Sequence, residues 1–181
     1  MTVALRAGGG LLVRPADTDD IPAIQAIYAH HVLHGLASFE EQPPDRTEME
    51  RRHRDVVARG LPWLIAEHGD RVLGYAYAGP YRTRPAYRHT LEDSVYVAPD
   101  ATGQGVGKTL LADLVGRCTA LGYRQMVAVI GDSGNVASIR LHERMGFRHV
   151  GELRAVGFKF GRWVDSVLMQ RPLGEGDATL P

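Results

Sequence analysis

A glycine-rich turn between a strand and a helix constrains the fold of this chain more than any other feature. Residues 89–97 have the composition of a strand, three alternating glycines follow between residues 103 and 107, and apolar spacing over residues 105–121 predicts a helix. The short apolar run at residues 126–130 predicts a second, buried strand. This succession of strand, turn, helix and strand predicts an α/β protein in which helices cover a sheet.

Turn residues, capping residues and hydrophobic spacing divide the rest of the chain into further short elements. Strands are predicted at residues 11–14, 63–67, 72–79, 147–154 and 158–170, and helices at residues 21–35, 45–60 and 135–144. Asp45 and Glu48 are expected to form a capping box at the start of the second of these helices. A length of 181 residues suits one domain. We therefore expect a flexible leader at residues 1–10, a single domain at residues 11–172 and a flexible tail at residues 173–181.

Charge and composition exclude several classes of protein. Lys plus Arg and Asp plus Glu both number 21, so no overall field attracts nucleic acid or an anionic membrane surface. The apolar run near the start is too short for a signal peptide or a spanning helix, so we expect a cytoplasmic protein without a membrane partner. His30 and His34 have a spacing found in metal sites, but no third ligand is evident, and no metal is predicted.

The glycine turn is suited to an anion. Glycines let backbone N–H groups gather around a pyrophosphate, and the N-terminus of the following helix adds partial positive charge. Two common nucleotide motifs do not match. A Walker loop needs glycine where Thr102 stands, and a dinucleotide fingerprint needs glycine where Lys108 stands. A pyrophosphate would fit this turn, but alternating glycines also occur in structural turns, so the spacing alone leaves both interpretations open.

Residues 102–107 resemble the acetyl-CoA pyrophosphate loop of the GNAT acetyltransferases, which reads Arg or Gln, two residues, Gly, one residue, then Gly or Ala. Thr102 departs from the first position, which removes a side-chain donor and leaves the backbone cradle. A second GNAT signature is matched, in the family's order, by Asn135, Ser138, His142, Gly146 and Phe147. The resemblance implies a mixed, mostly antiparallel central sheet with flanking helices, whose splayed central strands hold acetyl-CoA.

One branch of that superfamily, the phosphinothricin and methionine sulfoximine N-acetyltransferases, is similar to this chain over residues 12–171. The similarity lies in residues 62–67, 74–80, 92–97, 140–143 and 158–163. It implies acetylation of the α-amine of a small amino-acid-like substrate such as phosphinothricin, methionine sulfoximine or methionine sulfone. It also implies a homodimer, for which Phe158, Phe160 and Trp163 offer aromatic surface. Two alternatives stay open: a GNAT enzyme acting on another amine or a peptide, and a nucleotide-binding module without catalysis.

The implied reaction needs a proton acceptor for the amine and a proton for the leaving thiolate. Glu92 is the expected general base, because burial in a strand beside apolar residues would raise the pKa of its carboxyl group. Strand alternation places its neighbour Asp93 on the opposite face of the sheet. His142 stands where many GNAT enzymes have a Tyr general acid, and it either donates the proton to the thiolate or only contacts the cofactor.

The resemblance also implies the binding residues. Those expected to contact acetyl-CoA are Val95, Tyr96, Val97, Gly103, Gln104, Gly105, Val106, Gly107, Lys108, Asn135 and Arg144. Those expected to contact the acceptor are Phe39, Arg82, Thr83, Arg84, Tyr87, Glu92, Asp93 and Ser94. The two arginines stand out in the second set because guanidinium groups pair with carboxylate or phosphinate oxygens.

Overall fold

The computed structural model describes residues 10–181, so the predicted leader lies almost wholly outside the described residues. The helices are α1 (Ile21–His34), α2 (Arg46–Val57), α3 (Val106–Ala120) and α4 (Val136–Arg144). The strands are β1 (Leu12–Pro15), β2 (Trp63–His68), β3 (Arg71–Pro80), β4 (Thr90–Val97), β5 (Gln125–Gly131), β6 (Arg148–Lys159) and β7 (Arg162–Pro172). They form one sheet in the order β1-β2-β3-β4-β5-β7-β6. Among these described strands only β4 and β5 pair in parallel, which confirms the predicted mixed, mostly antiparallel sheet.

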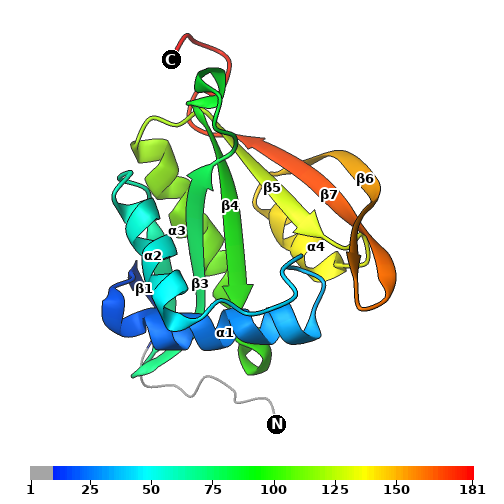
Figure 1. The fold of residues 1–181 in the computed structure, drawn as a ribbon. Coiled ribbons are helices and arrows are strands. Elements are labelled where there is room, and N and C mark those ends of the chain that lie inside the picture. The colour runs from blue at the N-terminus through cyan, green and yellow to red at the C-terminus, as the bar shows by residue number, and fades with distance from the viewer. Residues whose placement is uncertain (1–9) are drawn as a thin grey trace.

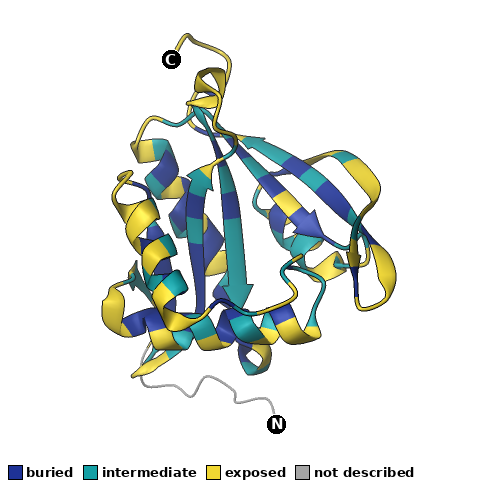
Figure 2. Cartoon of the chain, viewed as in Figure 1, coloured by how far each residue is buried: buried dark blue, intermediate teal, exposed yellow. Residues whose placement is uncertain are grey.

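The helices form two layers, one on each face of the sheet (Figure 1). Tyr28 of α1 contacts Tyr96 of β4, with ring centroids 5.0 Å apart, and α2 lies beside α1 on the same face. On the other face, where α3 and α4 lie, Gly74 of β3 leaves room for Leu110 of α3. Figure 2 shows the buried residues concentrated along the central strands and the helix sides that face them. Alternate side chains of β4 therefore project toward α1 and α2 or toward α3 and α4.

Helix α2 starts where the sequence predicts, but only half of the predicted capping box is present. The Asp45 carboxylate accepts the backbone N–H of Glu48 at 2.8 Å, as an N-cap residue should. The second half of the predicted capping box does not form, because the Glu48 carboxylate accepts hydrogen bonds from Arg51 and Arg52 instead. The prediction of a helix starting after Asp45 is confirmed, and the prediction of a complete capping box is wrong.

The parallel pair β4 and β5 separates along its length. The two strands are paired only from Thr90 and Gln125 to Asp93 and Ala128. Beyond that point β4 continues to pair with β3, and β5 continues to pair with β7 as far as Gly131. Figure 1 shows the two ribbons diverging toward α1. The predicted splay of the central strands is thus present in the chain's own backbone.

The last two strands differ from the prediction. A break was expected between residues 154 and 158, but β6 runs through this region, and the hairpin turn lies at Phe160 and Gly161, whose φ angles are 51° and 74°. The register of the β6–β7 pair shifts where the break was expected. There Ala155 has a φ of 52°, and its N–H is accepted by the carboxylate of Asp165 at 2.8 Å. An irregularity in a continuous hairpin was therefore misread as a loop.

The segment after β7 also differs from the predicted loose tail. Leu173 is buried, and its N–H donates to the carbonyl of Arg124 at 2.9 Å. The Arg124 guanidinium in turn donates to the hydroxyl of Thr179 at 2.9 Å. The first residues of the tail thus belong to the folded domain, because an apolar side chain at residue 173 completes the core beside β5.

Candidate active site

The divergence of β4 and β5 leaves part of the β4 backbone facing the gap. The N–H of Ala98, just after β4, donates to the carbonyl of Leu73 in β3 at 2.8 Å, so alternate residues of β4 direct their backbone groups toward β3. The residues between them, Val95 and Val97, direct theirs toward β5. Pairing with β5 ends before these two valines. The Nε2 of His31, on α1, donates to the carbonyl of Val97 at 2.9 Å. The N–H groups of both valines and the carbonyl of Val95 can therefore bind an extended ligand lying along the strand.

A cavity of about 50 Å³ lies between the diverging strands. Its walls come from β4, β5, α4 and the loop that follows α1. The lining residues are Ala37, Asp93, Ser94, Val95, Tyr96, Ala128, Val129, Ile130, Gly131, Asn135, Ser138 and His142. The fold thus brings predicted cofactor residues, predicted acceptor residues and the predicted catalytic histidine to one place.

The glycine turn opens onto the N-terminus of α3. Gly103 and Gly105 have φ angles of 76° and 83°, a conformation that glycine adopts without steric cost. At the start of α3 the N–H of Thr109 bonds to the carbonyl of Gly105, so the N–H groups of residues 106–108 precede any intrahelical acceptor. Lys108 is exposed on the same turn of helix. Free N–H groups, the helix dipole and a nearby ammonium group fit a pyrophosphate.

The remaining residues of this turn shape it from within. Gln104 donates from Nε2 to the carbonyl of Asp100 at 2.9 Å, and Thr102 donates from Oγ1 to the carbonyl of Pro99 at 3.1 Å. Both side chains are therefore engaged with backbone, and the N–H groups are left to face a ligand. Arg144, predicted near the phosphates, is exposed at the end of α4.

Glu92 lies on the α1–α2 face of the sheet, in alternation with Tyr96. The pKa of its carboxyl group is raised to about 6, first by burial and then by the negative charge of Asp93, while Arg82 opposes the shift. A carboxyl group with this pKa is mostly ionised at pH 7 and still basic enough to accept a proton from an ammonium group. This electrostatic setting suits the predicted general base.

Asp93 lies on the opposite face and pairs with His142. The Nε2 of His142 is 3.0 Å from Oδ2 of Asp93, and its Nδ1 is 2.8 Å from the carbonyl of Ser138. Because a carbonyl only accepts, Nδ1 carries a hydrogen, and one shared proton then occupies the contact between the histidine and the carboxylate. Burial lowers the pKa of His142, but the hydrogen bond to Asp93 and its negative charge outweigh burial, so the pKa is raised. The other Asp93 oxygen, Oδ1, is buried without a hydrogen-bond partner among residues 10–181.

The predicted acceptor arginines line a separate, larger cavity of about 610 Å³ at the end of β3. Arg82, Thr83, Arg84 and Tyr87 lie on its wall with Arg59, Arg88 and five further residues, Pro80, Pro85, Thr90, Leu91 and Tyr123. Thr90 and Leu91, the two residues that precede Glu92 on β4, lie on this wall, so the cavity adjoins the strand segment that carries the predicted base. Sequence reasoning missed Arg59 and Arg88, because a lone arginine in a polar segment has no local signature.

Phe39 does not line either of these cavities. Its ring lies over Gly157 of β6, where a Cβ atom would come within 2.5 Å of the ring. The side chain is 42% exposed, so it remains accessible to solvent. Among the predicted acceptor residues, the structure therefore places Phe39 apart from the arginines.

Sequence reasoning also missed a stack of aromatic side chains on the α1–α2 face. The ring of Tyr77 lies 4.3 Å from that of Trp63, and the ring of Tyr75 lies 5.3 Å from that of Tyr96. Tyr77 stands opposite Ser94 in the β3–β4 pair, so the stack reaches the strand that carries Glu92. The alternation of tyrosines in residues 75–77 was a usable signal for this surface.

Neither a metal cluster nor a membrane-spanning helix is found in the described part of the chain. Across residues 10–181 no three His, Cys, Asp or Glu side chains group closely enough to hold a metal ion. Over the same residues no helix combines the length and the apolar character needed to cross a bilayer.

The chain's relatives are acetyltransferases. The model of the Acetyltransferase (GNAT) family matches residues 25–147. Phosphinothricin N-acetyltransferase of Alcaligenes faecalis is 62% identical over 169 residues, which cover 93% of this chain and 86% of that protein. The L-methionine sulfoximine/L-methionine sulfone acetyltransferase of Salmonella typhimurium is 39% identical, with 91% of this chain and 96% of that protein covered.

Solved structures show the same relationship. A GNAT superfamily phosphinothricin acetyltransferase from Sinorhizobium meliloti, in complex with acetyl-CoA, has a TM-score of 0.92 and 49% identity and covers 94% of this chain and 92% of that chain. A ribosomal-protein-alanine N-acetyltransferase from Brucella melitensis has a TM-score of 0.88 and 42% identity, with coverages of 90% and 100%. The splayed strands, the glycine turn and these similarities agree, and the chain belongs to the GNAT acetyltransferase family.

Proposed function

We propose that this chain transfers an acetyl group from acetyl-CoA to the α-amino group of a small amino-acid-like acceptor such as phosphinothricin, methionine sulfoximine or methionine sulfone. The observation that carries the proposal is the position of Glu92, a carboxyl group with a pKa raised to about 6 on the strand whose backbone faces the gap. The relatives named for these acceptors support the substrate class. The acetyl-CoA complex of a structural neighbour supports the cofactor.

The chain's own groups fit acetyl-CoA. In this proposal the N–H groups at the start of α3 hold its pyrophosphate, and the backbone of Val95 and Val97 binds its pantetheine arm beside Asn135. Acetyl-CoA would supply the activated thioester. The role of the chain is to hold that thioester in the gap, next to the strand that carries the base.

Glu92 and Arg82 together orient the acceptor. Glu92 removes a proton from the acceptor's ammonium group, directly or through one water molecule, and the resulting amine is the nucleophile. Arg82, whose charge reaches Glu92, and the other arginines of the adjoining cavity bind the acceptor's acidic groups. An acceptor held at both ends presents its nitrogen to the gap.

If His142 supplies the proton to the thiolate, only one of its two ring protons is available for donation. Its Nδ1 hydrogen is held by the carbonyl of Ser138, so the donated proton must be the one shared with Asp93. In the alternative role, the hydrogen bond between His142 and Asp93 stays intact and only holds α4 beside the cofactor. Asp93→Asn would shift the acidic limb of the pH profile in both roles, because the charge of Asp93 also acts on Glu92. It would change the alkaline limb, which a histidine general acid sets, only in the first role.

A substrate screen tests the function. Purified protein is given acetyl-CoA and, in separate reactions, phosphinothricin, methionine sulfoximine, methionine sulfone, glutamate, methionine and a peptide with an N-terminal alanine, and released thiol is measured. We expect the highest kcat/KM among the first three compounds, because their oxidised phosphorus or sulfur groups and carboxylates offer oxygens to the arginines. Absence of thiol release with every amine would reject the proposal.

The peptide acceptor represents a second candidate function, favoured by the structural neighbour named as a ribosomal-protein-alanine N-acetyltransferase. A preference for the alanine peptide in the same screen would support it. Calorimetry with acetyl-CoA, ATP and NAD separates both enzymes from the remaining alternative, a non-catalytic nucleotide-binding module. That module would bind ATP or NAD and would not transfer the acetyl group of acetyl-CoA.

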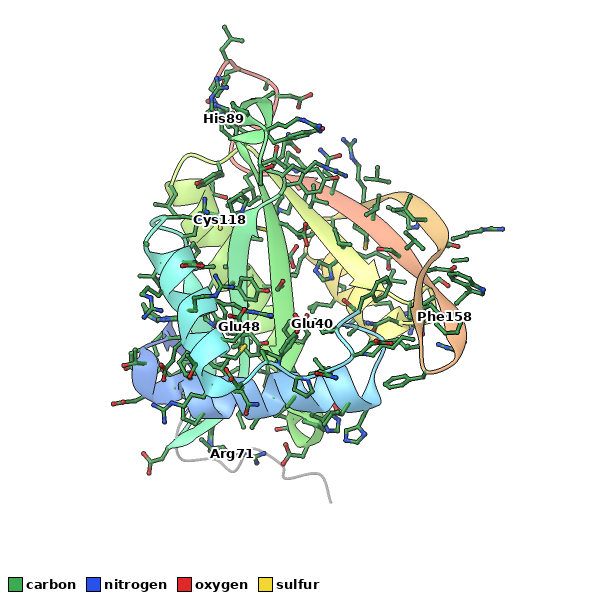
Figure 3. All side chains as sticks on the ribbon, in the orientation of Figure 1. Glu40, Glu48, Arg71, His89, Cys118 and Phe158 are labelled. Atoms are coloured by element: carbon green, nitrogen blue, oxygen red, sulfur yellow. The ribbon has the colours of Figure 1, made fainter. Side chains whose placement is uncertain are left out.

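We also propose that the protein acts as a homodimer in the cytoplasm, where acetyl-CoA and free amino acids occur. Phe158, Phe160 and Trp163 of the β6–β7 hairpin are 57%, 58% and 67% exposed, and Figure 3 shows Phe158 at the outer edge of the molecule. Such a group of large apolar side chains is typical of a surface that is covered in solution. Light scattering is expected to give the mass of two chains, and the mass of one chain at micromolar concentration would contradict the dimer.

A further inference from the structure

Gly79, near the end of β3, is a strand glycine whose conformation and packing do not require glycine. Glycine weakens a strand relative to alanine, because it loses more conformational freedom on folding. The φ angle of Gly79 is not in the left-handed region that favours glycine. A Cβ atom added to it would meet no other atom of the described chain within 4 Å. A larger residue would therefore fit at this position and strengthen the strand.

Gly74, earlier on the same strand, shows what a structural requirement for glycine looks like. A Cβ atom at Gly74 would lie 2.7 Å from the carbonyl oxygen of Tyr96, so packing excludes any side chain there. No such contact exists at Gly79, and the β3–β4 register is regular from Gly74 to Pro80, so no bulge accounts for the glycine. The remaining common reason for a glycine inside a strand is the close approach of a ligand.

The open space at Gly79 lies beside the proposed base. Gly79 is paired with Glu92 in the β3–β4 ladder, and directly paired residues project from the same face with their Cβ positions about 4.5–5.5 Å apart. Helix α1 crosses the other end of β4, where Tyr28 contacts Tyr96, and does not fill this space (Figure 1). Burial and neighbouring charges cause the raised pKa of Glu92, and no hydrogen bond contributes to it. The carboxylate oxygens are thus available to a ligand in this space.

The base and the glycine opposite it lie between the two cavities of the site. The next pair of the ladder in one direction is Pro80 with Leu91, and both residues line the arginine cavity. The next pair in the other direction is Ala78 with Asp93, and Asp93 lines the cavity between β4 and β5. An amino acid whose acidic groups are held by the arginines must place its nitrogen between that cavity and the thioester in the gap. The open space has this position.

We propose that Gly79 forms the floor of the subsite in which the acceptor's ammonium group and α-carbon contact Glu92, and so determines which amines reach the base. The inference rests on the proposed acetyl transfer to an amine. Tyr77, two residues earlier on the same face, bounds the subsite, and its ring is held 4.3 Å from that of Trp63. An α-carbon that carries both a carboxylate and a side chain fits here because residue 79 has no side chain of its own.

The experiment compares Gly79→Ala and Gly79→Val with wild type. We expect kcat/KM for phosphinothricin to fall about tenfold in Gly79→Ala and about 10²-fold in Gly79→Val, because a displacement of about 1 Å is enough to cost about 10²-fold. The dissociation constant of phosphinothricin, measured by calorimetry on protein saturated with CoA, should rise in the same order. The dissociation constant of acetyl-CoA should stay within about twofold. The melting temperature of Gly79→Ala should rise by about 1–4 °C, because alanine replaces a strand glycine.

Two other glycines provide matched controls. Gly151 of β6 is also a half-buried strand glycine without a left-handed φ angle or a neighbour within 4 Å of an added Cβ atom, and it lines neither cavity. Gly151→Ala should therefore leave phosphinothricin binding and turnover unchanged. Gly74→Ala, where the added methyl group meets the backbone, should lower the melting temperature. The two controls separate the effect of a strand glycine in general from that of a glycine required by packing.

Activity and stability should change in opposite directions only if a ligand is the reason for the glycine at residue 79. Unchanged affinity and turnover for phosphinothricin in Gly79→Ala would overturn the inference, as would a loss of stability equal to that of Gly74→Ala. Gly79→Ala is decisive alone if Gly79→Val does not fold, because its methyl group meets no atom of the described chain. Failure of wild type to acetylate any amine would instead reject the proposed function, so the two failures are distinguishable.

Discussion

Replacing Glu92 with Gln separates catalysis from stability. The substitution keeps the size and hydrogen-bonding groups of the side chain and removes its ability to accept a proton. If Glu92 is the general base, turnover at pH 7 falls by roughly 10²–10⁴-fold, the usual contribution of such a group. Acetyl-CoA affinity stays unchanged, because no carboxylate takes part in the glycine turn.

The same substitution is expected to stabilise the fold. The folded pKa of Glu92 is raised from 4.5 to about 6, so the folded state binds the proton more tightly than the unfolded state does. Stability from this group is present below pH 4.5 and is lost as pH rises through 6. A shift of this size corresponds to about 2 kcal/mol at pH 7. Glu92→Gln should recover up to that amount, which is about 4–8 °C in melting temperature for a chain of this length.

Two assays on the same samples test the reasoning. Turnover is measured from pH 6 to pH 9.5, where the deficit of the variant should shrink as free amine becomes abundant, and melting temperature is measured at pH 4.5 and pH 7. A variant that is slower and more stable at pH 7 supports both parts. Near-normal turnover at pH 7 would reject the general base, and a lower melting temperature at pH 7 would reject the account of the raised pKa.

The other predictions concern the remaining parts of the site. Arg82→Ala should raise the KM of phosphinothricin about tenfold or more, since it removes a charge-assisted hydrogen bond to the acceptor, and an equal loss of acetyl-CoA affinity would move this arginine to the cofactor site. Asp93→Asn should lower the free energy of unfolding at pH 6 by up to about 3–5 kcal/mol, because it breaks a buried pair. Because the pKa of His142 is raised in the folded state, protonated His142 stabilises the fold fully below pH 6.5, and this stabilisation is lost as pH rises through the folded pKa. Chemical denaturation should therefore give a smaller difference in free energy of unfolding between wild type and Asp93→Asn at high pH. A difference that does not change with pH would contradict the pairing. Gly105→Ala, at a φ of 83°, should weaken acetyl-CoA binding measured by calorimetry, and unchanged binding would show that the turn does not hold the pyrophosphate.

The sequence was sufficient for those elements whose signals are local. Asp45 marked the start of α2, and the glycines before α3 marked a turn, because caps and left-handed residues depend on a few neighbouring atoms. The β6–β7 hairpin was misplaced because Ala155 and Phe160 both have positive φ angles, at 52° and 51°. Neither residue is a turn former, so only the contacts of the folded chain, such as the bond from Ala155 to Asp165, stabilise these conformations.

The site was predictable to the extent that strand alternation determines it. Alternation correctly separated Glu92 from Asp93, but it did not identify the partner of each side chain. The pairing of Asp93 with His142 joins residues 49 positions apart, and the bonds of Lys159 to the loop after α1 join residues more than 120 apart. Such contacts follow from the packing of whole elements, and no property of the residues' own neighbours predicts them.

The two adjacent carboxyl groups of β4 therefore have different chemistry for a structural reason. Asp93 projects toward α4, where His142 shares a proton with it, and Glu92 projects toward the face covered by α1 and α2. The negative charge of Asp93 still reaches Glu92 and contributes to raising its pKa. While His142 and Asp93 share the proton, the negative charge of Asp93 is partly neutralised. If His142 gives that proton to the thiolate, the full negative charge of Asp93 returns. Proton donation by His142 would thus raise the pKa of Glu92 further late in the reaction. If the proton stays between His142 and Asp93, the pKa of Glu92 stays the same throughout the reaction.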